Sequence, residues 1–318
     1  MPGAENKHTH WLVADIGATS SRCAVFEADA AALQQVRYFR NDDFADAGHL
    51  LRHYFSELGR PPRSAVLAVA APVSGTTIRM INRDWLIDRD ALMFDLDLAE
   101  LEVINDFHAI AYALPLMDER SRAEIGTASD YRHGNRAVLG PGSGLGVAAW
   151  IEDAGTGLPM CGEGGHVTMS ARDAEEESIL RKVRDRFGHC SAERVLSGPG
   201  LIALHKAMHD IDVQTSEEIT GNFGNDACAA TMEQFFRFLA SVSADLALTT
   251  GSVGGLYIAG GIVPACIQQI RDSSFRERFE DKNRYREYMR AIPTYVITDP
   301  VPGLTGVAAF ISRQGARL

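Results

Sequence analysis

The 318-residue sequence has a shortage of basic charge and contains no long apolar run. Thirty-one Lys and Arg stand against 42 Asp and Glu, which gives a formal net charge of −11. Such a charge repels phosphate backbones and anionic lipid, so neither nucleic acid nor a membrane is an expected partner. Glycine, proline or charged residues interrupt every apolar run before the roughly 18 residues of a membrane-spanning helix.

Cysteine is scarce as well, and its pattern excludes several kinds of site. The five residues are Cys23, Cys161, Cys190, Cys228 and Cys266. Their number is odd, they are scattered, and no Cys-x-x-Cys pair is present to form a zinc site or a redox motif. This pattern indicates a reducing compartment. The opening segment MPGAENKHTH lacks the apolar region of a secretory signal, so we expect a cytoplasmic protein.

What is present is the composition of an ordinary globular protein, with 46% hydrophobic and 23% charged residues. At about 100–200 residues per domain, the length predicts two domains. The polar segment 119–135 is a plausible boundary between them.

Apolar runs and helical spacings alternate along the chain. In the first part, the pattern predicts strands at 11–16, 21–26, 65–70 and 101–104, a possible strand at 35–40, and helices at 49–58 and 107–114. In the second part, it predicts strands at 137–139, 147–151, 256–259 and 294–298, and helices at 174–187, 199–209, 226–250 and 304–313. Each set begins with a glycine-bent hairpin, which indicates two related α/β lobes with a cleft between them.

The two hairpin turns are candidate phosphate sites. In the first, DIGATSSR (15–22), a carboxylate lies at the end of a buried strand and is followed by small and hydroxyl-bearing residues. Such residues are suited to binding phosphate. A plain hairpin turn explains it equally well, and no Walker lysine follows. The second, GPGSGLG (140–146), lacks the dinucleotide-binding spacing, but its four glycines modestly favour a closely approaching ligand. Gly260 and Gly261 could serve an adenosine ring or merely begin a helix.

Polar residues stand at three further places. Asn105 and Asp106 follow strand 101–104, at the edge where open α/β sheets bind ligands, although an Asp there more commonly caps a helix. Glu163 and His166 lie on the glycine loop 162–166, without the spacing of a zinc site, and a lone His is more often structural. Glu193, near an expected helix start, is equally well explained as a surface acid.

Seven segments, in order along nearly the whole chain, resemble the bacterial glucokinase family of the sugar kinase, actin and Hsp70 ATPase superfamily. They are DIGAT (15–19), AAPVSG (70–75), INDF (104–107), GPGSGLG (140–146), GEGGH (162–166), SAERVLSGPG (191–200) and IAGGIVP (258–264). The resemblance implies an α/β, two-lobed, actin-like ATPase (ribonuclease H-like) fold with an interlobe cleft. Beyond a polar tail at 1–10, we expect a small domain at 11–116 plus about 303–318, and a large domain at 117–302.

In function, the resemblance implies transfer of the γ-phosphoryl group of MgATP to the 6-hydroxyl of glucose, giving glucose 6-phosphate and ADP. Asp106 would be the general base, and the implied sugar ligands are Asn105, Glu163, His166 and Glu193. The implied nucleotide residues are Asp15, Gly17, Ala18, Thr19, Gly142, Ser143, Gly260 and Gly261. Magnesium would arrive with ATP, and water near Asp15 could link it to the protein. A homodimer is possible, since dimers are common in the family.

Two residues depart from the family pattern. Ala18 stands where glycine is usual, and Ala265 where arginine is common. We expect the Ala18 methyl group to point away from phosphate. The alternatives are a hexose kinase acting on mannose or fructose or using another donor, and a catalytically inactive sugar sensor. A sensor would be expected to lose the base or to gain a DNA-binding segment, whereas Asp106 is present and the tail before the first strand is short.

Overall fold

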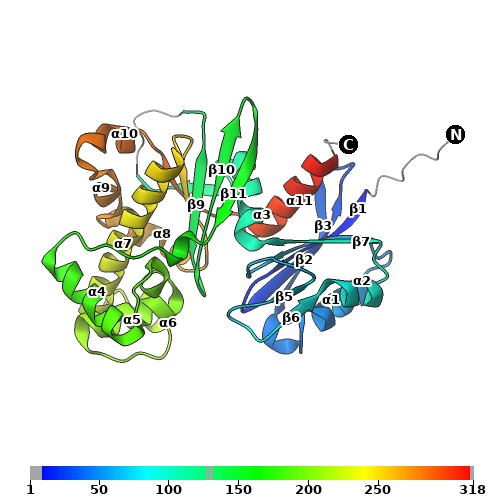
Figure 1. Cartoon of the computed structure of the whole chain (residues 1–318), viewed down its shortest axis with the longest axis horizontal. Helices are drawn as coiled ribbons and strands as arrows, with labels where there is room; N and C mark the ends of the chain where they lie inside the picture. The colour runs from blue at the N-terminus through cyan, green and yellow to red at the C-terminus, as the bar shows by residue number, and fades with distance from the viewer. Residues whose placement is uncertain (1–8, 127, 129–131, 316–318) are drawn as a thin grey trace. The chain divides into compact units, whose positions relative to one another are not determined.

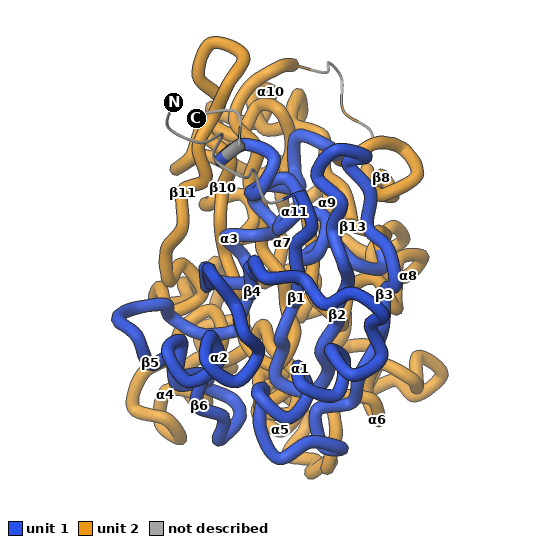
Figure 2. Tube along the Cα trace, turned by 90° about the vertical axis from the view of Figure 1, so that its right-hand side faces the viewer, with its two compact units in different colours: residues 1–116, 300–318 blue, residues 117–299 orange. Residues whose placement is uncertain are grey.

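The computed structural model describes residues 9–126, 128 and 132–315. The chain divides into two compact units, which Figure 2 colours separately. Unit 1 comprises residues 1–116 and 300–318, and unit 2 comprises residues 117–299. Most of the expected N-terminal tail, residues 1–8, lies outside the described residues, and His10 already begins the first strand.

Unit 1 contains a five-stranded sheet in the order β3-β2-β1-β4-β7. Its strands are β1 (His10–Ile16), β2 (Ser20–Glu27), β3 (Ala32–Arg40), β4 (Ser64–Val69) and β7 (Glu100–Asn105). Strand β1 pairs antiparallel with β2 and parallel with β4, and β4 pairs parallel with β7. The carboxyl ends of β1, β4 and β7 therefore meet at one edge of the sheet, where Asp15 and Asn105 lie.

Helices cover both faces of this sheet (Figure 1). One face packs against α1 (Ala47–Ser56) and α2 (Arg89–Asp95), and the other against α3 (Asp106–Ala113) and α11 (Pro302–Gly315). The alternation of strand side chains explains the two layers: Leu12 of β1 belongs to the core with α1, and Val13 to the core with α11. A small hairpin, β5 (Thr77–Arg79) and β6 (Leu86–Asp88), completes the unit together with η1 (Asn41–Asp43) and η2 (Leu114–Leu116).

Unit 2 contains a six-stranded sheet in the order β11-β10-β9-β12-β13-β8. Its strands are β8 (Arg122–Glu124), β9 (Arg136–Pro141), β10 (Leu145–Asp153), β11 (Thr156–Gly162), β12 (Leu256–Ile258) and β13 (Thr294–Ile297). Its helices are α4 (Ala174–Phe187), α5 (Gly198–His209), α6 (Glu217–Thr220), α7 (Asp226–Thr250), α8 (Ile267–Asp272), α9 (Phe275–Glu280) and α10 (Arg286–Arg290), with short turns η3 (Gly164–His166), η4 (Ala192–Arg194), η5 (Val263–Cys266) and η6 (Asn283–Tyr285).

The two sheets share a local plan. In each, an antiparallel hairpin is followed by a strand that pairs parallel with the first strand of the hairpin, β4 on β1 and β12 on β9. The expectation of an α/β chain with two related lobes is confirmed. None of the helices in the described part of the chain is long and apolar enough to cross a membrane.

Some sequence expectations need correction. The segment 119–135 contains β8, which is too short and polar to be noticed but pairs with β13. Strand β11 was missed because its sequence, TGLPMCG, includes glycine and proline. Three consecutive acids, 175–177, are typical of a solvated helix face, yet Glu176 is fully buried and accepts two hydrogen bonds from Arg278, at 2.9 and 2.8 Å.

Candidate active site

At the junction between β7 and α3, one residue caps the helix and its neighbour provides a carboxylate that is not needed as the cap. Asn105 is the N-cap of α3, and its side-chain oxygen accepts hydrogen bonds from the backbone N–H groups of Phe107, at 2.9 Å, and His108, at 3.1 Å. Its amide nitrogen donates to Ala71 O at 3.2 Å. Because Asn105 performs the capping, Asp106 is not needed for it.

Asp106 is a partly buried carboxylate in the first turn of α3. Desolvation, reinforced by the negative charge of Asp15, raises the pKa of Asp106 to about 7. Hydrogen bonds, including one from Phe107 N at 2.9 Å, oppose this rise but do not cancel it. Near neutral pH this carboxylate therefore exchanges its proton readily, as acid–base catalysis requires.

Asp15 lies at the same edge of the sheet. Asp15 pairs with Ala68 of β4. The next residue of β4, Val69, pairs with Asn105 of β7, so Asp15 and Asn105 are nearly level across the sheet. The Asp15 side chain is 15% exposed, and Arg22 Nη1 lies 3.6 Å from its carboxylate. Burial raises the pKa of Asp15, and the Arg22 charge counteracts part of that effect. Unit 1 thus brings together two carboxylates and one guanidinium.

Gly303 is a neighbour of Asp15 that the sequence did not reveal. A Cβ atom at Gly303 would lie 2.6 Å from both Cγ and Oδ2 of Asp15, closer than atoms can approach. The first turn of α11 therefore packs directly on the carboxylate, and only glycine fits there. The sequence signal is the glycine that immediately precedes the expected helix 304–313.

The turn between β1 and β2 is tight and partly buried. Gly17 N donates to Ser20 O at 3.1 Å, which closes the turn. The Ala18 side chain is 9% exposed, whereas Thr19 is exposed. The extra methyl group of Ala18 is thus covered by protein.

In unit 2, the turn between β9 and β10 lies next to the glycine pair that follows β12. A Cβ atom at Gly260 would lie 2.1 Å from Pro141 O, and Gly260 has a φ of +83°. Gly142 O accepts a hydrogen bond from Gly198 N at 2.8 Å, at the start of α5. The predicted residues Gly142, Ser143, Gly260 and Gly261 therefore come from two segments that meet at one place in unit 2.

The three predicted sugar ligands of unit 2 also lie on adjoining segments. Ala192 N donates to Val167 O at 2.9 Å, which joins η4, with Glu193, to the end of the loop that carries Glu163 and His166. His166 Nε2 lies 4.0 Å from Glu163 Oε2, and both side chains are more than half exposed. Glu193 is partly buried and accepts a hydrogen bond from Leu145 N at 2.8 Å. One carboxylate oxygen of Glu193 therefore supports the glycine-rich turn, and the other is available.

Comparison with known proteins shows which family the chain resembles over nearly its whole length. The glucokinase family model matches residues 12–314. A glucokinase of Caulobacter sp. (strain K31) is 37% identical over 96% of this chain and 95% of its own length. A glucokinase of Aromatoleum aromaticum is 39% identical over 93% of each chain.

The chain belongs to the glucokinase family. A glucokinase structure from an Antarctic psychrotroph is 33% identical, covers 96% of this chain and 99% of that one, and has a TM-score of 0.83. Membership assigns a glucokinase activity, the transfer of a phosphoryl group to a hexose, and implies the use of ATP.

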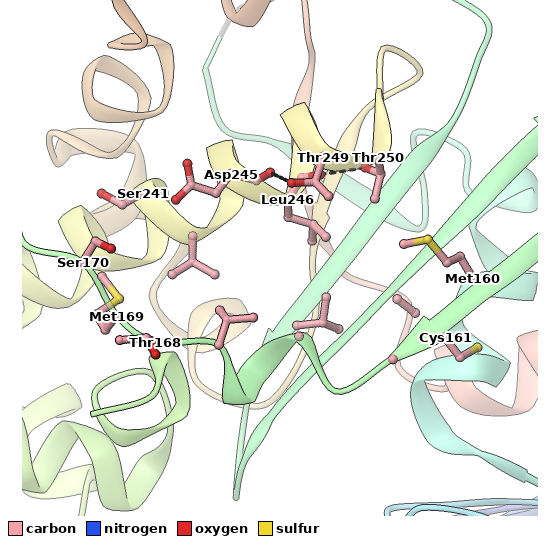
Figure 3. Close-up of a pocket in the computed structure, with 16 residues that line it drawn as sticks. Met160, Cys161, Thr168, Met169, Ser170, Ser241, Asp245, Leu246, Thr249 and Thr250 are labelled. Carbon is pink, nitrogen blue, oxygen red and sulfur yellow. Dashed lines mark hydrogen bonds between the residues drawn. The ribbon is translucent and has the colours of Figure 1, made fainter. Parts of the chain in front are cut away.

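A cavity of about 330 Å³ in unit 2 of this glucokinase-family chain borders the loop that carries Glu163 and His166, because Gly162, Gly164 and Val167 are among its lining residues. Figure 3 shows Met160 and Cys161 of β11 on one side of it, with Asp245, Leu246, Thr249 and Thr250 of α7 on another. None of the predicted site residues lines it. Its single carboxylate, Asp245, is paired with Lys282, and the hydroxyl groups of Thr249 and Thr250 donate to backbone oxygens of α7. This chemistry does not suit phosphate, and we assign the cavity no role.

Proposed function

We propose that Asp106 is the general base of an ATP-dependent glucokinase. It accepts the proton of the 6-hydroxyl of glucose while that oxygen takes the γ-phosphoryl group of MgATP, which yields glucose 6-phosphate and ADP. The observation that supports this role is the position and the pKa of Asp106. Its carboxylate lies where the parallel strands end, it is not needed as the helix cap because Asn105 has that role, and its pKa is about 7. A base is most effective when its pKa lies near the working pH.

The nucleotide is proposed to bind through backbone donors and not through a Walker lysine. Gly17, Ala18 and Thr19 of unit 1, with Gly142 and Ser143 of unit 2, are the proposed phosphate residues, and Gly260 and Gly261 are the proposed adenosine neighbours. The tight turns and glycine contacts of these segments support the proposal. Phosphoryl transfer asks a protein mainly for in-line placement of the reactants and for charge balance.

Magnesium is proposed to enter with ATP. The described residues contain no group of three or more His, Cys, Asp or Glu that could hold a metal by itself. Asp15 nevertheless fits this ion, because magnesium in kinases is commonly held by one or two carboxylates together with substrate phosphates. Asp15 would hold it through water. When bound, magnesium neutralises charge on the phosphate oxygens.

For the sugar, we propose that Asn105, Glu163, His166 and Glu193 bind the remaining hydroxyl groups. A sugar offers only hydroxyls, and a charged hydrogen bond contributes about 1.5–3 kcal/mol. The adjoining positions of η3 and η4, and the second carboxylate oxygen of Glu193, support this assignment.

The decisive experiment replaces Asp106 by Asn. Asn keeps the shape and the acceptor for Phe107 N but cannot take the proton, so turnover is expected to fall by roughly 10²–10⁴, with glucose binding weakened much less. Asp90→Asn is the matched control, because Asp90 is an acid in the first turn of α2 in the same unit. A folded Asp106→Asn protein with a near wild-type rate would refute the role.

Substrate range and assembly are tested separately. A coupled assay over glucose, mannose and fructose, each with ATP, ADP or polyphosphate, distinguishes a glucokinase from another hexose kinase, and binding of sugar without turnover would indicate a sensor. We further propose a cytoplasmic location, where MgATP is available, and a homodimer, as the family resemblance implies. Light scattering that gave the monomer mass at assay concentrations would contradict the dimer.

A further inference from the structure

The turn that joins β1 and β2 is held by two residues outside every segment singled out above. Asn41 follows β3 and begins η1, and Arg83 lies in the turn of the β5–β6 hairpin. Between them they donate hydrogen bonds to three successive backbone oxygens, those of Gly17, Ala18 and Thr19.

Asn41 is fully buried and uses its backbone and its side chain against this turn. Its Nδ2 donates to Gly17 O at 2.7 Å, and its backbone N donates to Thr19 O at 3.0 Å. Its Oδ1 accepts a hydrogen bond from Ser21 Oγ at 2.7 Å. The same side chain therefore holds both ends of the turn.

Arg83 holds the middle of the turn. Its Nη1 donates to Ala18 O at 3.3 Å, and its Nη2 donates to Asn41 O at 2.7 Å. Asp42 balances the charge with an oxygen 2.9 Å from Nη1. The guanidinium carbon lies 4.4 Å from the ring centre of Trp85, whose side chain is buried. The stacking on Trp85, the ion pair with Asp42 and the two carbonyl acceptors together fix the direction of the guanidinium group.

Fixing these oxygens also fixes the neighbouring N–H groups. In a trans peptide the C=O and the following N–H point in opposite directions, and no cis peptide is present among the described residues. Because Gly17 O faces Asn41 and Ala18 O faces Arg83, the N–H groups of Ala18 and Thr19 face the other way. Neither of these two N–H groups donates a hydrogen bond to another described residue.

We propose that Arg83 and Asn41 are positioning residues that hold the N–H groups of Ala18 and Thr19 in place for phosphate oxygens of ATP. The inference rests on the proposed role of this turn in nucleotide binding. Donors that are already oriented bind without the cost of ordering the turn, which is how preorganisation raises affinity. The arrangement also accounts for Ala18, since a turn fixed through its carbonyl groups has no need of a flexible glycine.

The test compares Arg83→Met with Arg79→Met. Met keeps an apolar stem over Trp85 but has no donors, whereas Arg79 lies on β5 of the same hairpin, is 71% exposed and pairs only with Asp84 in the described structure. Arg83→Met is expected to weaken binding of a non-hydrolysable ATP analogue about ten-fold, or about 1.4 kcal/mol. The KM for glucose should change less than about two-fold, and Arg79→Met should behave as wild type.

Arg83→Lys is the second variant, and it keeps the charge and the fold. Lysine lacks the planar fork that spans the Ala18 and Asn41 carbonyl groups, so a loss of nucleotide affinity is expected here too. Amide hydrogen exchange without nucleotide adds an independent measurement, because the amides of Gly17 and Asn41, which donate to Ser20 O and Thr19 O across the turn, should exchange faster in both variants.

The outcomes separate this inference from the proposed function. If wild type binds the analogue and phosphorylates glucose, but Arg83→Met binds the analogue equally well, the positioning role is wrong and the kinase proposal stands. If wild-type protein does not bind the analogue, the nucleotide role of the turn fails, and the inference fails with it. Unchanged exchange at Gly17 and Asn41 in a folded Arg83→Met protein also overturns the inference.

Discussion

The two glycine-bent hairpins of this chain share a fold and differ in what holds their turns. In unit 1, the β1–β2 turn has one glycine, and side chains from distant segments, Asn41 and Arg83, hold its backbone oxygens. In unit 2, the segment 140–146 around the β9–β10 turn has four glycines, two of them in the turn itself, and its backbone lies against other backbone, such as Pro141 O against Gly260. Side chains that donate hydrogen bonds hold the first turn in place. The second turn is held by close contacts between backbone atoms, which are possible because glycine has no side chain.

The largest effect is expected where backbone meets backbone, at Gly260. In Gly260→Ala, the new Cβ atom would lie 2.1 Å from Pro141 O, at a φ of +83° that favours glycine. Overpacking and strain together should lower the free energy of unfolding by roughly 3 kcal/mol, measured by urea denaturation. Gly261→Ala is the control, because a Cβ atom there meets nothing within 4 Å. Equal stability of the two variants would contradict the close-contact explanation.

A second prediction uses pH to test the role of Asp106 in unit 1. Asp106 must be ionised to act as base, so kcat/KM for glucose should fall about ten-fold per pH unit below its pKa of about 7. Because this pKa is raised by folding, the folded state binds more protons between about 4 and 7, and stability is lost as pH rises through that window. Asp106→Asn should remove that part of the pH dependence of stability. A flat kcat/KM profile from pH 5.5 to 7 would contradict the assignment.

The double use of Glu193 gives a third prediction. Glu193→Ala removes both the acceptor for Leu145 N and the proposed sugar ligand, so KM should rise for glucose and for ATP. Glu193→Gln retains a neutral acceptor for Leu145 N, so it should raise the KM for glucose about ten-fold, or about 1.4 kcal/mol, with ATP little affected. Steady-state kinetics over both substrates tests this, and an equal rise for ATP in both variants would place Glu193 outside the sugar site.

The smallest effect is expected at Ala18. Its methyl group is buried and its carbonyl oxygen is bound by Arg83, so Ala18→Gly should change the KM for ATP by less than about two-fold. A ten-fold gain in ATP affinity would show that the methyl group obstructs phosphate. The same substitution in an Arg83→Met background should weaken binding further, because glycine then adds freedom to a turn that is no longer held.

Elements with strong local patterns were predictable. The helical spacing gave the bounds of α4 and α7, and both glycine hairpins were found, because side-chain periodicity and turn residues are properties of neighbouring positions. Strands β8 and β11 were missed, since a short polar strand or one with Gly and Pro is stabilised by its partner strand and not by its own pattern.

For the candidate site, the sequence alone determined that carboxylates follow apolar strands, that small residues form the turns, and that the segments follow the order of the glucokinase family. Only the tertiary structure decided that Asn105 caps α3, that Gly303 packs on Asp15, and that Asn41 and Arg83 hold the first turn. It also decided that Glu176 is buried and that Asp106 has a pKa of about 7. The reason is physical: desolvation, charge coupling and close packing depend on atoms that distant parts of the chain bring together, and no local pattern records them.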